Sequence, residues 1–201
     1  MRELLESFDN QKIIRQNKRH YLIIPMTDHY KATDPVILRQ AVNAICDVVN
    51  WMDGSPITKI VSEEEKGGFI AVCVALQRGI AFSLAKQNPI RLPGEIGISK
   101  FKMAYSDEMS LYLNGLQKGD RVIIIDDVVD TGGTIIAMIK AVRKARVGIA
   151  DVVCLAEKTE VGGVKRIKEE TGIDVKTIIK LDTSGKKSKV LGTIFDLPRV
   201  E

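Results

Sequence analysis

One thirteen-residue segment near the middle of the chain limits the possible folds more than any other feature. Residues 122–134 read VIIIDDVVDTGGT. Four branched apolar residues in a row predict a strand buried on both faces, which is typical of a parallel sheet. The small and polar residues that follow lead into apolar positions with helical spacing as far as Ala145. A buried strand, a glycine turn and a helix in this order indicate an α/β fold.

Strand-like and helical patterns alternate on both sides of this segment. Asp34-Pro35 is a favoured start for a helix, and apolar residues recur at helical spacing from there to Asn50. Further helices are expected at 69–76, which is predicted to be buried, at 134–145 and at 164–170. Strands are expected at 57–61, 80–84, 110–113, 121–125, 152–156 and 175–181. The alternation predicts a Rossmann-like, mostly parallel sheet with helices on both faces, in a single domain spanning residues 1–201.

Three segments do not fit this alternation. Residues 11–26 alternate between basic and apolar stretches, which predicts a short hairpin or an edge element. Residues 86–106 hold prolines and glycines with no sustained period, so we expect a long loop, and a loop of this length in a compact domain is usually functional. Residues 184–189 are predicted to form a solvated turn.

Composition excludes several classes of protein. The net charge of +4 is spread along the chain, which gives no argument for a nucleic-acid partner. The three cysteines are far apart, so they fit neither a disulfide framework nor a zinc site, and we interpret them as reduced core thiols. The chain has no run of about 18 apolar residues, and its first six residues carry acids where a signal peptide needs basic residues. We therefore expect a cytoplasmic protein with no membrane partner.

The same central segment predicts a binding site. Ligands of parallel α/β sheets bind beyond the carboxyl ends of the strands, and Asp126 and Asp127 follow the apolar run, so we expect both carboxylates to face a crevice. The turn at 131–134 offers glycines, hydroxyls and backbone N–H groups at the start of a helix, which is an arrangement that binds phosphate. Two carboxylates suited to a diol or a cation, close to a phosphate turn, indicate a site for a ribose 5-phosphate.

Other interpretations of this segment fit less well. An acidic pair after an apolar strand also occurs in P-loop ATPases, but the pattern G-x-x-x-x-G-K-[ST] is absent from the chain. The dinucleotide pattern G-x-G-x-x-G is absent too. Residues 122–134 instead resemble the signature of the type I phosphoribosyltransferases. The segment RLPGE at 91–95 is similar to adenine phosphoribosyltransferases, and LYLNG at 111–115 with IPMTD at 24–28 is similar to archaeal hypoxanthine-guanine enzymes.

The resemblance implies roles for individual residues. Asp126 and Asp127 would hydrogen-bond the ribose hydroxyls of 5-phosphoribosyl-1-pyrophosphate and contact its metal indirectly. The residues that would hold the 5-phosphate are Asp130, Thr131, Gly132, Gly133 and Thr134. The residues that would contact pyrophosphate are Glu64, Glu65, Lys66, Gly67 and, from a second loop, Lys86. The string at 63–69 departs from the adenine enzymes by an extra acid, an extra glycine and a lysine in place of arginine, and a plain solvated acidic turn is the alternative.

The implied activity is a magnesium-dependent purine phosphoribosyl transfer that yields a nucleoside 5′-monophosphate and pyrophosphate. Adenine enzymes usually carry alanine at the position of Asp130, whereas many 6-oxopurine enzymes carry aspartate near N7 of the base, so Asp130 is a candidate catalytic residue. Adenine and hypoxanthine or guanine both stay open as substrates. A regulator of the same fold that binds phosphoribosyl pyrophosphate and nucleic acid is the alternative function.

The resemblance also implies features around the site. A hood over the base is expected from residues 1–33 and from the C-terminal region, and a homodimer is expected by analogy. The loop at 86–106 would be a lid, with contacts from Lys100, Lys102, Tyr105 and Ser106. Trp51 and Tyr30 could stack on a base or serve packing alone.

Overall fold

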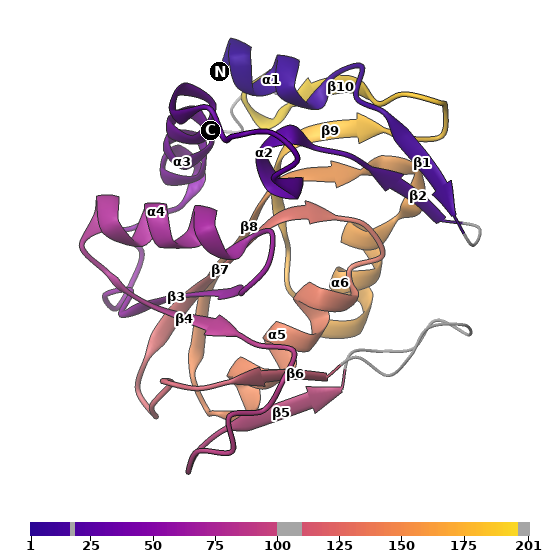
Figure 1. Cartoon of the computed structure of the whole chain (residues 1–201). Helices are drawn as coiled ribbons and strands as arrows, with labels where there is room; N and C mark the ends of the chain where they lie inside the picture. The colour runs from indigo at the N-terminus through magenta and orange to yellow at the C-terminus, as the bar shows by residue number, and fades with distance from the viewer. Residues whose placement is uncertain (17–18, 100–109, 197–201) are drawn as a thin grey trace.

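The computed structural model describes residues 1–16, 19–99 and 110–196 and is built on one central six-stranded sheet (Figure 1). The strand order across the sheet is β10-β9-β8-β7-β3-β4. The strands are β3 (Lys59–Glu63), β4 (Ala81–Ala85), β7 (Arg121–Val129), β8 (Gly148–Lys158), β9 (Lys176–Asp182) and β10 (Lys189–Thr193). β10 pairs antiparallel with β9, and the other pairings in this sheet are parallel. The predicted fold class, a mostly parallel α/β sheet, is confirmed.

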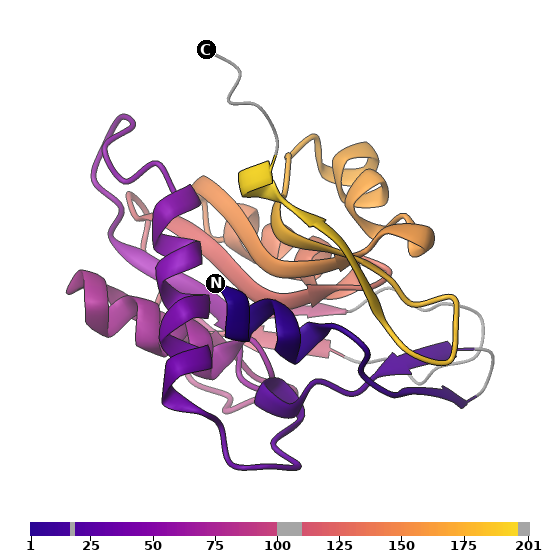
Figure 2. The same cartoon turned by 90° about the horizontal axis from the view of Figure 1, so that it is seen from above.

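Helices cover both faces of the sheet (Figure 2). One face is packed by α1 (Arg2–Phe8), α3 (Pro35–Val48) and α4 (Gly68–Arg78). The other face is packed by α5 (Gly133–Lys144), α6 (Gly163–Thr171) and a small ribbon of β5 (Ile96–Ser99) and β6 (Ser110–Leu113). The sheet is thus the middle layer of three, as expected for parallel strands that must be buried on both sides.

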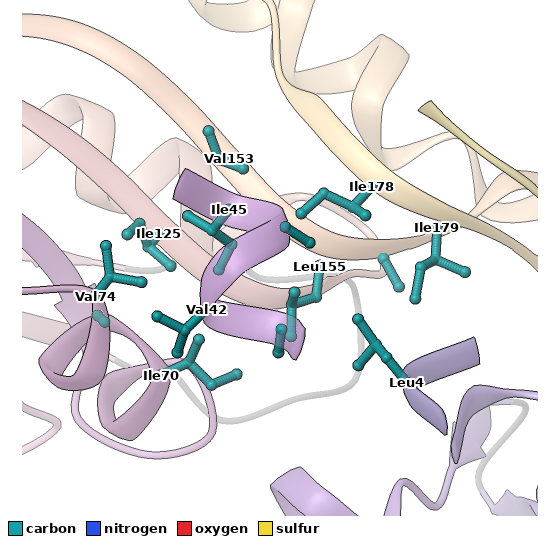
Figure 3. Packing of buried hydrophobic residues seen from close by; sticks show 14 of the residues in the cluster. Leu4, Val42, Ile45, Ile70, Val74, Ile125, Val153, Leu155, Ile178 and Ile179 are labelled. Carbon is teal, nitrogen blue, oxygen red and sulfur yellow. The ribbon is translucent and has the colours of Figure 1, made fainter. Parts of the chain in front are cut away.

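Strand β7 shows why its sequence is an unbroken apolar run. Ile123 and Ile125 point into the cluster formed with α3 and α4, whereas Val122 and Ile124 point into the cluster formed with α5. All four side chains are fully buried. Figure 3 shows Ile125 beside Val153 of the neighbouring strand within the first of these clusters. Both faces of the strand therefore require apolar residues, and no polar position interrupts it before Asp126.

The boundaries of several elements differ from the sequence prediction. Helix α3 starts as predicted, because Asp34 Oδ1 accepts the Val36 N–H at 2.7 Å and Pro35 follows as the first helical residue. β3 begins at Lys59 rather than at residue 57, and β8 extends well beyond both predicted ends. The prediction of a buried helix at 69–76 is wrong for one face of α4. Its outward face is uncovered, and Leu76 there is 76% exposed.

The expectation of a structureless loop at 86–106 is also wrong. β5 lies inside that segment and pairs antiparallel with β6, with Ile96 opposite Leu113. Gly97 lies against the ring of Tyr112, where an added Cβ would come within 3.2 Å of the ring. A four-residue strand with a glycine in it gives too short an alternation to be recognised among prolines. The suggested lid contacts Lys100, Lys102, Tyr105 and Ser106 lie outside the described residues.

The N-terminal segment packs against the C-terminal part of the chain. The predicted hairpin is present as β1 (Ile13–Gln16) and β2 (Arg19–Leu22), and a short helix α2 (Pro25–Asp28) follows it. The segment at 184–189 is not simply a solvated turn, since Ser188 is buried and exchanges main-chain hydrogen bonds with Asn10 and Gln11. Within the described ranges, no helix is long and apolar enough to cross a membrane.

Replacing one core side chain tests this account of the sheet. Ile123→Ala removes a fully buried side chain from the central strand, so we expect the free energy of unfolding to fall by about 2–5 kcal/mol. Leu76→Ala on the exposed face of α4 is the control, with an expected change within about 0.5 kcal/mol. Urea unfolding measures both, and a loss at Leu76 as large as that at Ile123 would contradict the layer assignment.

Candidate active site

The candidate site lies where the order of strands in the sheet changes direction. The chain passes from β3 to β4 on one side and later places β7 on the other side of β3. Parallel sheets bind ligands in the crevice at such a point, outside the carboxyl ends of the strands. The loops that leave β3 and β7 at this end are residues 64–67 and 130–132. They contain most of the site residues predicted from sequence.

Asp126 and Asp127 lie inside β7, which corrects the expectation that the strand ends before them. β7 continues to Val129 and stays paired with β8 there. The two residues are only 6% and 7% exposed. Asp126 Oδ1 accepts the Asp127 N–H at 2.9 Å, and Asp127 Oδ1 accepts the Val128 N–H at 2.8 Å. The carboxylates are therefore held rigidly by their own strand rather than projected from a loose strand end.

Burial raises the pKa of the Asp127 carboxyl above its ordinary value. The ammonium of Lys66 and the N–H of Val128 oppose that shift, whereas the nearby carboxylate of Glu63 adds to it. The Thr27 hydroxyl also favours the charged form of Asp127, although its oxygen is buried and makes no hydrogen bond of good geometry. The ligand-free site thus holds a carboxylate whose negative charge is poorly compensated, which favours a hydroxyl-bearing or cationic ligand.

The loop after β3 is folded back onto the loop after β4. Glu64 donates its N–H to Ala85 O at 2.9 Å, and its carboxylate lies 3.9 Å from Lys86 Nζ. The side-chain amide of Gln87 donates to Glu65. These contacts bring together the predicted residues Glu64, Glu65 and Lys86. They also place the Lys86 ammonium and the Gln87 amide beside two of the acids.

Gly67 brings the β3 loop into contact with the acidic pair. A Cβ at this position would lie 2.5 Å from Asp126 Oδ1 and 2.9 Å from Ser62 Oγ. Only a residue without a side chain fits there. The loop at 64–67 therefore lies directly against Asp126 of β7.

The turn from Asp130 to Thr134 is shaped by two glycines of different elements. Gly132 has a φ of +80°, and a Cβ on it would lie 2.8 Å from Ile167 of α6. Gly163, the first residue of α6, approaches so closely that a Cβ would lie 2.0 Å from the carbonyl oxygen of Asp130. The turn leads into α5, whose first backbone N–H groups have no intrahelical acceptors. This geometry suits an anion such as phosphate.

Lys158 is a site residue that the sequence reasoning missed. It ends β8, its side chain is 6% exposed, and its Nζ lies 3.0 Å from Asp130 Oδ2 and 2.8 Å from the carbonyl oxygen of His20. The Asp130 side chain is 47% exposed, so its other side remains open to solvent. The available signal was a charged residue two positions after the end of the strand predicted at 152–156.

Two aromatic candidates do not take part in a visible site. Trp51 donates its ring N–H to Cys46 O at 2.8 Å and stacks with Arg78, whose guanidinium carbon lies 4.3 Å from the ring centre. Arg78 ends α4, at the end of the sheet where β4 begins. Trp51 therefore packs at the opposite end from the phosphate turn. Tyr30 is exposed and lies near Lys31.

The residues present fit a magnesium ion only together with a substrate. In the part of the chain that the structure describes, no three His, Cys, Asp or Glu side chains gather to hold a metal. Mg²⁺ usually keeps several waters and binds one or two carboxylates plus the phosphates of a substrate. Asp126 and Asp127 would supply the oxygen ligands that such an arrangement needs, directly or through water.

Comparisons with known proteins decide the family. The description "Phosphoribosyl transferase domain" belongs to a family model that matches residues 82–182. A hypoxanthine/guanine phosphoribosyltransferase of Methanocaldococcus jannaschii is 35% identical over 94% of this chain and 99% of its own length. Another, from Methanothermococcus okinawensis, is 37% identical over 95% of this chain and 100% of its own. The chain belongs to the purine branch of the type I phosphoribosyltransferases.

Solved structures agree on the fold. An adenine phosphoribosyltransferase from Thermoanaerobacter pseudethanolicus has a TM-score of 0.71 and 22% identity, covering 90% of this chain and 99% of that one. The corresponding protein of Rhodothermus marinus has a TM-score of 0.72 with the same identity. These similarities confirm the phosphoribosyltransferase fold that the sequence predicted.

A glycine substitution tests the shape of the phosphate turn. In Gly163→Ala the new Cβ would collide with the carbonyl oxygen of Asp130, so the turn must move. We expect affinity for phosphoribosyl pyrophosphate to fall by about tenfold or more, the order of an overpacking cost of 1–3 kcal/mol. Gly148→Ala is the matched control, because its nearest atoms are 3.8 Å from the new Cβ. If calorimetry shows that the two variants bind phosphoribosyl pyrophosphate with equal affinity, the assignment of the turn at 130–134 to the phosphate is wrong.

The burial of Asp127 predicts a pH-dependent effect on stability. Its pKa is raised in the folded state, so its contribution to stability is greatest at low pH and is lost as the pH rises through the folded pKa. Asp127→Asn should therefore stabilise the ligand-free protein near neutral pH, and this gain should shrink toward acid. Urea unfolding at several pH values measures the difference.

Asp120 provides a control of opposite sign. Burial acts to raise the pKa of its carboxyl, but hydrogen bonds from Lys59, Gln117 and Thr58 outweigh burial and lower it. Asp120→Asn should therefore destabilise the protein near neutral pH, and the loss should disappear below the ordinary pKa of an aspartate. If both variants shifted stability in the same direction with pH, the electrostatic account of Asp127 would be wrong.

Proposed function

We propose that this purine phosphoribosyltransferase acts on a 6-oxopurine, hypoxanthine or guanine, with phosphoribosyl pyrophosphate as the donor. The observation that carries the proposal is the pairing of Asp130 with the buried ammonium of Lys158 at the phosphate turn. The relatives at 34–37% identity that are named hypoxanthine/guanine phosphoribosyltransferases support the same choice. The alternative of a nucleic-acid-binding regulator has no support from these relatives.

The chemistry of the Asp130–Lys158 pair favours an oxo group over an amino group. An ammonium only donates hydrogen bonds, so Lys158 suits the carbonyl oxygen at position 6 of hypoxanthine or guanine. The amino group of adenine at that position would present its own N–H donors to Lys158. A carboxylate beside the ammonium can accept or return the proton of the neighbouring N7. The pair thus matches the donor and acceptor pattern along one edge of a 6-oxopurine.

The other predicted residues take the parts of the sugar diphosphate. Asp126 and Asp127 bind the two ribose hydroxyls, for which charge-assisted hydrogen bonds are strong. The turn from Thr131 to Thr134 holds the 5-phosphate with backbone N–H groups and the dipole of α5. Gly67 allows the β3 loop to lie against these groups. Glu64 and Glu65 orient the loop through Lys86 and Gln87 rather than touching pyrophosphate themselves.

Displacement at the anomeric carbon places positive charge on the sugar while pyrophosphate departs with negative charge. Lys66 and Lys86 are the cations available to the departing group, and the buried carboxylates of Asp126 and Asp127 lie on the side of the sugar. Mg²⁺, when bound with the substrate, supplies further charge neutralisation at the pyrophosphate. Asp130 serves as the catalytic residue that exchanges a proton with the base.

Residues 1–33 and the C-terminal region form the hood over the base in this proposal. Their contact supports it, because Lys12 and Lys187 form an antiparallel bridge and the carbonyl oxygen of His20 reaches Lys158. A homodimer and a cytoplasmic location remain predictions of the sequence.

A substrate panel with one variant tests the function. The wild-type protein with Mg²⁺ should turn over hypoxanthine and guanine and should use adenine, uracil and orotate poorly. Asp130→Asn keeps an oxygen that can accept a hydrogen bond from Lys158, but it removes the carboxylate that would exchange a proton with the purine. We therefore expect kcat for hypoxanthine to fall by roughly 10²–10⁴. Affinity for phosphoribosyl pyrophosphate should change little, since the backbone donors of the phosphate turn remain.

Two results would overturn the assignment. Efficient turnover of adenine by the wild type would reject the choice of base. Parallel loss of donor affinity and activity in Asp130→Asn would show that Asp130 maintains the phosphate turn and does not transfer a proton. Each result is read from kcat and KM values for the base and the donor, together with calorimetric affinity for the donor.

A further inference from the structure

The short helix α2 lies against the loop that follows β3. Two contacts join them. Asp28, the last residue of α2, forms an ion pair with Lys66 of the loop. His29, the next residue along the chain, packs its ring against Phe69 in the first turn of α4, with the ring centres 4.9 Å apart. The N-terminal segment therefore touches both the loop and the start of the helix that follows the loop.

Both oxygens of the Asp28 carboxylate are used. Oδ2 accepts the N–H of Ile24 at 2.7 Å, at the start of the same short helix, and Oδ1 faces Lys66. The first bond fixes the direction of the carboxylate, because the acceptor is tied to main chain only four residues away. The side chain of Asp28 is 18% exposed and that of Lys66 is 45% exposed. The carboxylate of Asp28, which is fixed in direction and largely buried, thus holds the end of the long and flexible Lys66 side chain.

The place at which Lys66 is held matters for the site. The residue before Asp28 is Thr27, whose buried hydroxyl lies close to the carboxylate of Asp127. Lys66 also acts on that carboxylate by its charge. The ion pair with Asp28 therefore ties the Lys66 ammonium to α2, at the edge of the loop. A lysine without such a partner would be free to extend into solvent from this exposed turn.

We propose that Asp28 is a positioning residue that holds the Lys66 ammonium ready for the diphosphate of the donor. The inference rests on the proposed function, in which Lys66 contacts pyrophosphate. An ammonium has three N–H donors, so one can bind Asp28 while the others bind diphosphate oxygens. Fixing the side chain before the substrate arrives lowers the entropy lost on binding. Asp28 thereby couples the N-terminal segment to recognition of the leaving group.

Asp28→Asn separates this role from a purely structural one. The amide oxygen of asparagine can still accept the Ile24 N–H, so the α2 turn keeps its cap, whereas the charge that holds Lys66 is lost. We expect KM for phosphoribosyl pyrophosphate to rise roughly threefold to tenfold, with kcat changed less than about twofold. Calorimetric affinity for inorganic pyrophosphate with Mg²⁺ should fall by the same factor.

The double variant provides the decisive comparison. If Asp28 acts through Lys66, adding Asp28→Asn to Lys66→Met should weaken pyrophosphate binding no further than Lys66→Met alone. Asp34→Asn is the matched control, since Asp34 also caps a helix through its carboxylate, at Val36, and lies at the start of α3. This control should bind pyrophosphate like the wild type.

Three outcomes would overturn the inference. They are unchanged pyrophosphate affinity in Asp28→Asn, additive losses in the double variant, and a loss of thermal stability in Asp28→Asn with normal KM. Failure of phosphoribosyl transfer itself looks different, because the wild type would then neither bind pyrophosphate nor turn over any purine, and the positioning role of Asp28 would be rejected as well. A wild type that uses adenine would reject only the choice of base and would leave the test of Asp28 unchanged. A wild type that is active beside a normal Asp28→Asn rejects the positioning role alone.

Discussion

The burial of β7 on both faces is the constraint on which the rest of the structure depends. Its alternating side chains join the two halves of the core, so the strand cannot shift without disrupting both. Asp126 and Asp127 belong to this rigid strand, so the packing of the strand fixes their positions. Acidic groups on a flexible loop would need to be ordered by the substrate at an entropic cost. In this structure the packing of β7 in the core orders the two aspartates before any substrate binds.

The same burial creates an electrostatic cost that shapes the surroundings of the site. Carboxylates removed from water are destabilised unless cations or donors face them. The charge of Lys66 acts on the buried carboxylate of Asp127, whereas in the second pair it is Lys158 that is buried and Asp130 that is half-exposed. Each lysine is in turn tied to the N-terminal segment, Lys66 through Asp28 and Lys158 through His20. The N-terminal segment and the sheet are therefore linked through these charged side chains.

Close backbone contacts complete the site. Gly67 lets the β3 loop approach Asp126, and Gly163 lets α6 approach the carbonyl oxygen of Asp130. These contacts join segments that are about 30 to 60 residues apart in the chain. The absence of a side chain at these glycines permits the close approach, because any side chain would push the neighbouring segments apart. A local motif thus depends on residues far from it in sequence.

The sequence by itself determined the fold class, the strand–turn–helix unit and the positions of the acidic pair and the glycine turn, because these depend on local periodicity and on a short motif. The family resemblance assigned Glu64, Lys66 and Lys86 to one pyrophosphate site, and in the structure the ammonium of Lys86 lies 3.9 Å from the carboxylate of Glu64. Only the tertiary structure decided that β7 runs through the two aspartates, that β5 forms within the long loop, and that Lys158 pairs with Asp130 and Asp28 with Lys66. Those features arise from pairing between strands and from contacts between distant segments, and neither leaves a periodic signal in the residues involved.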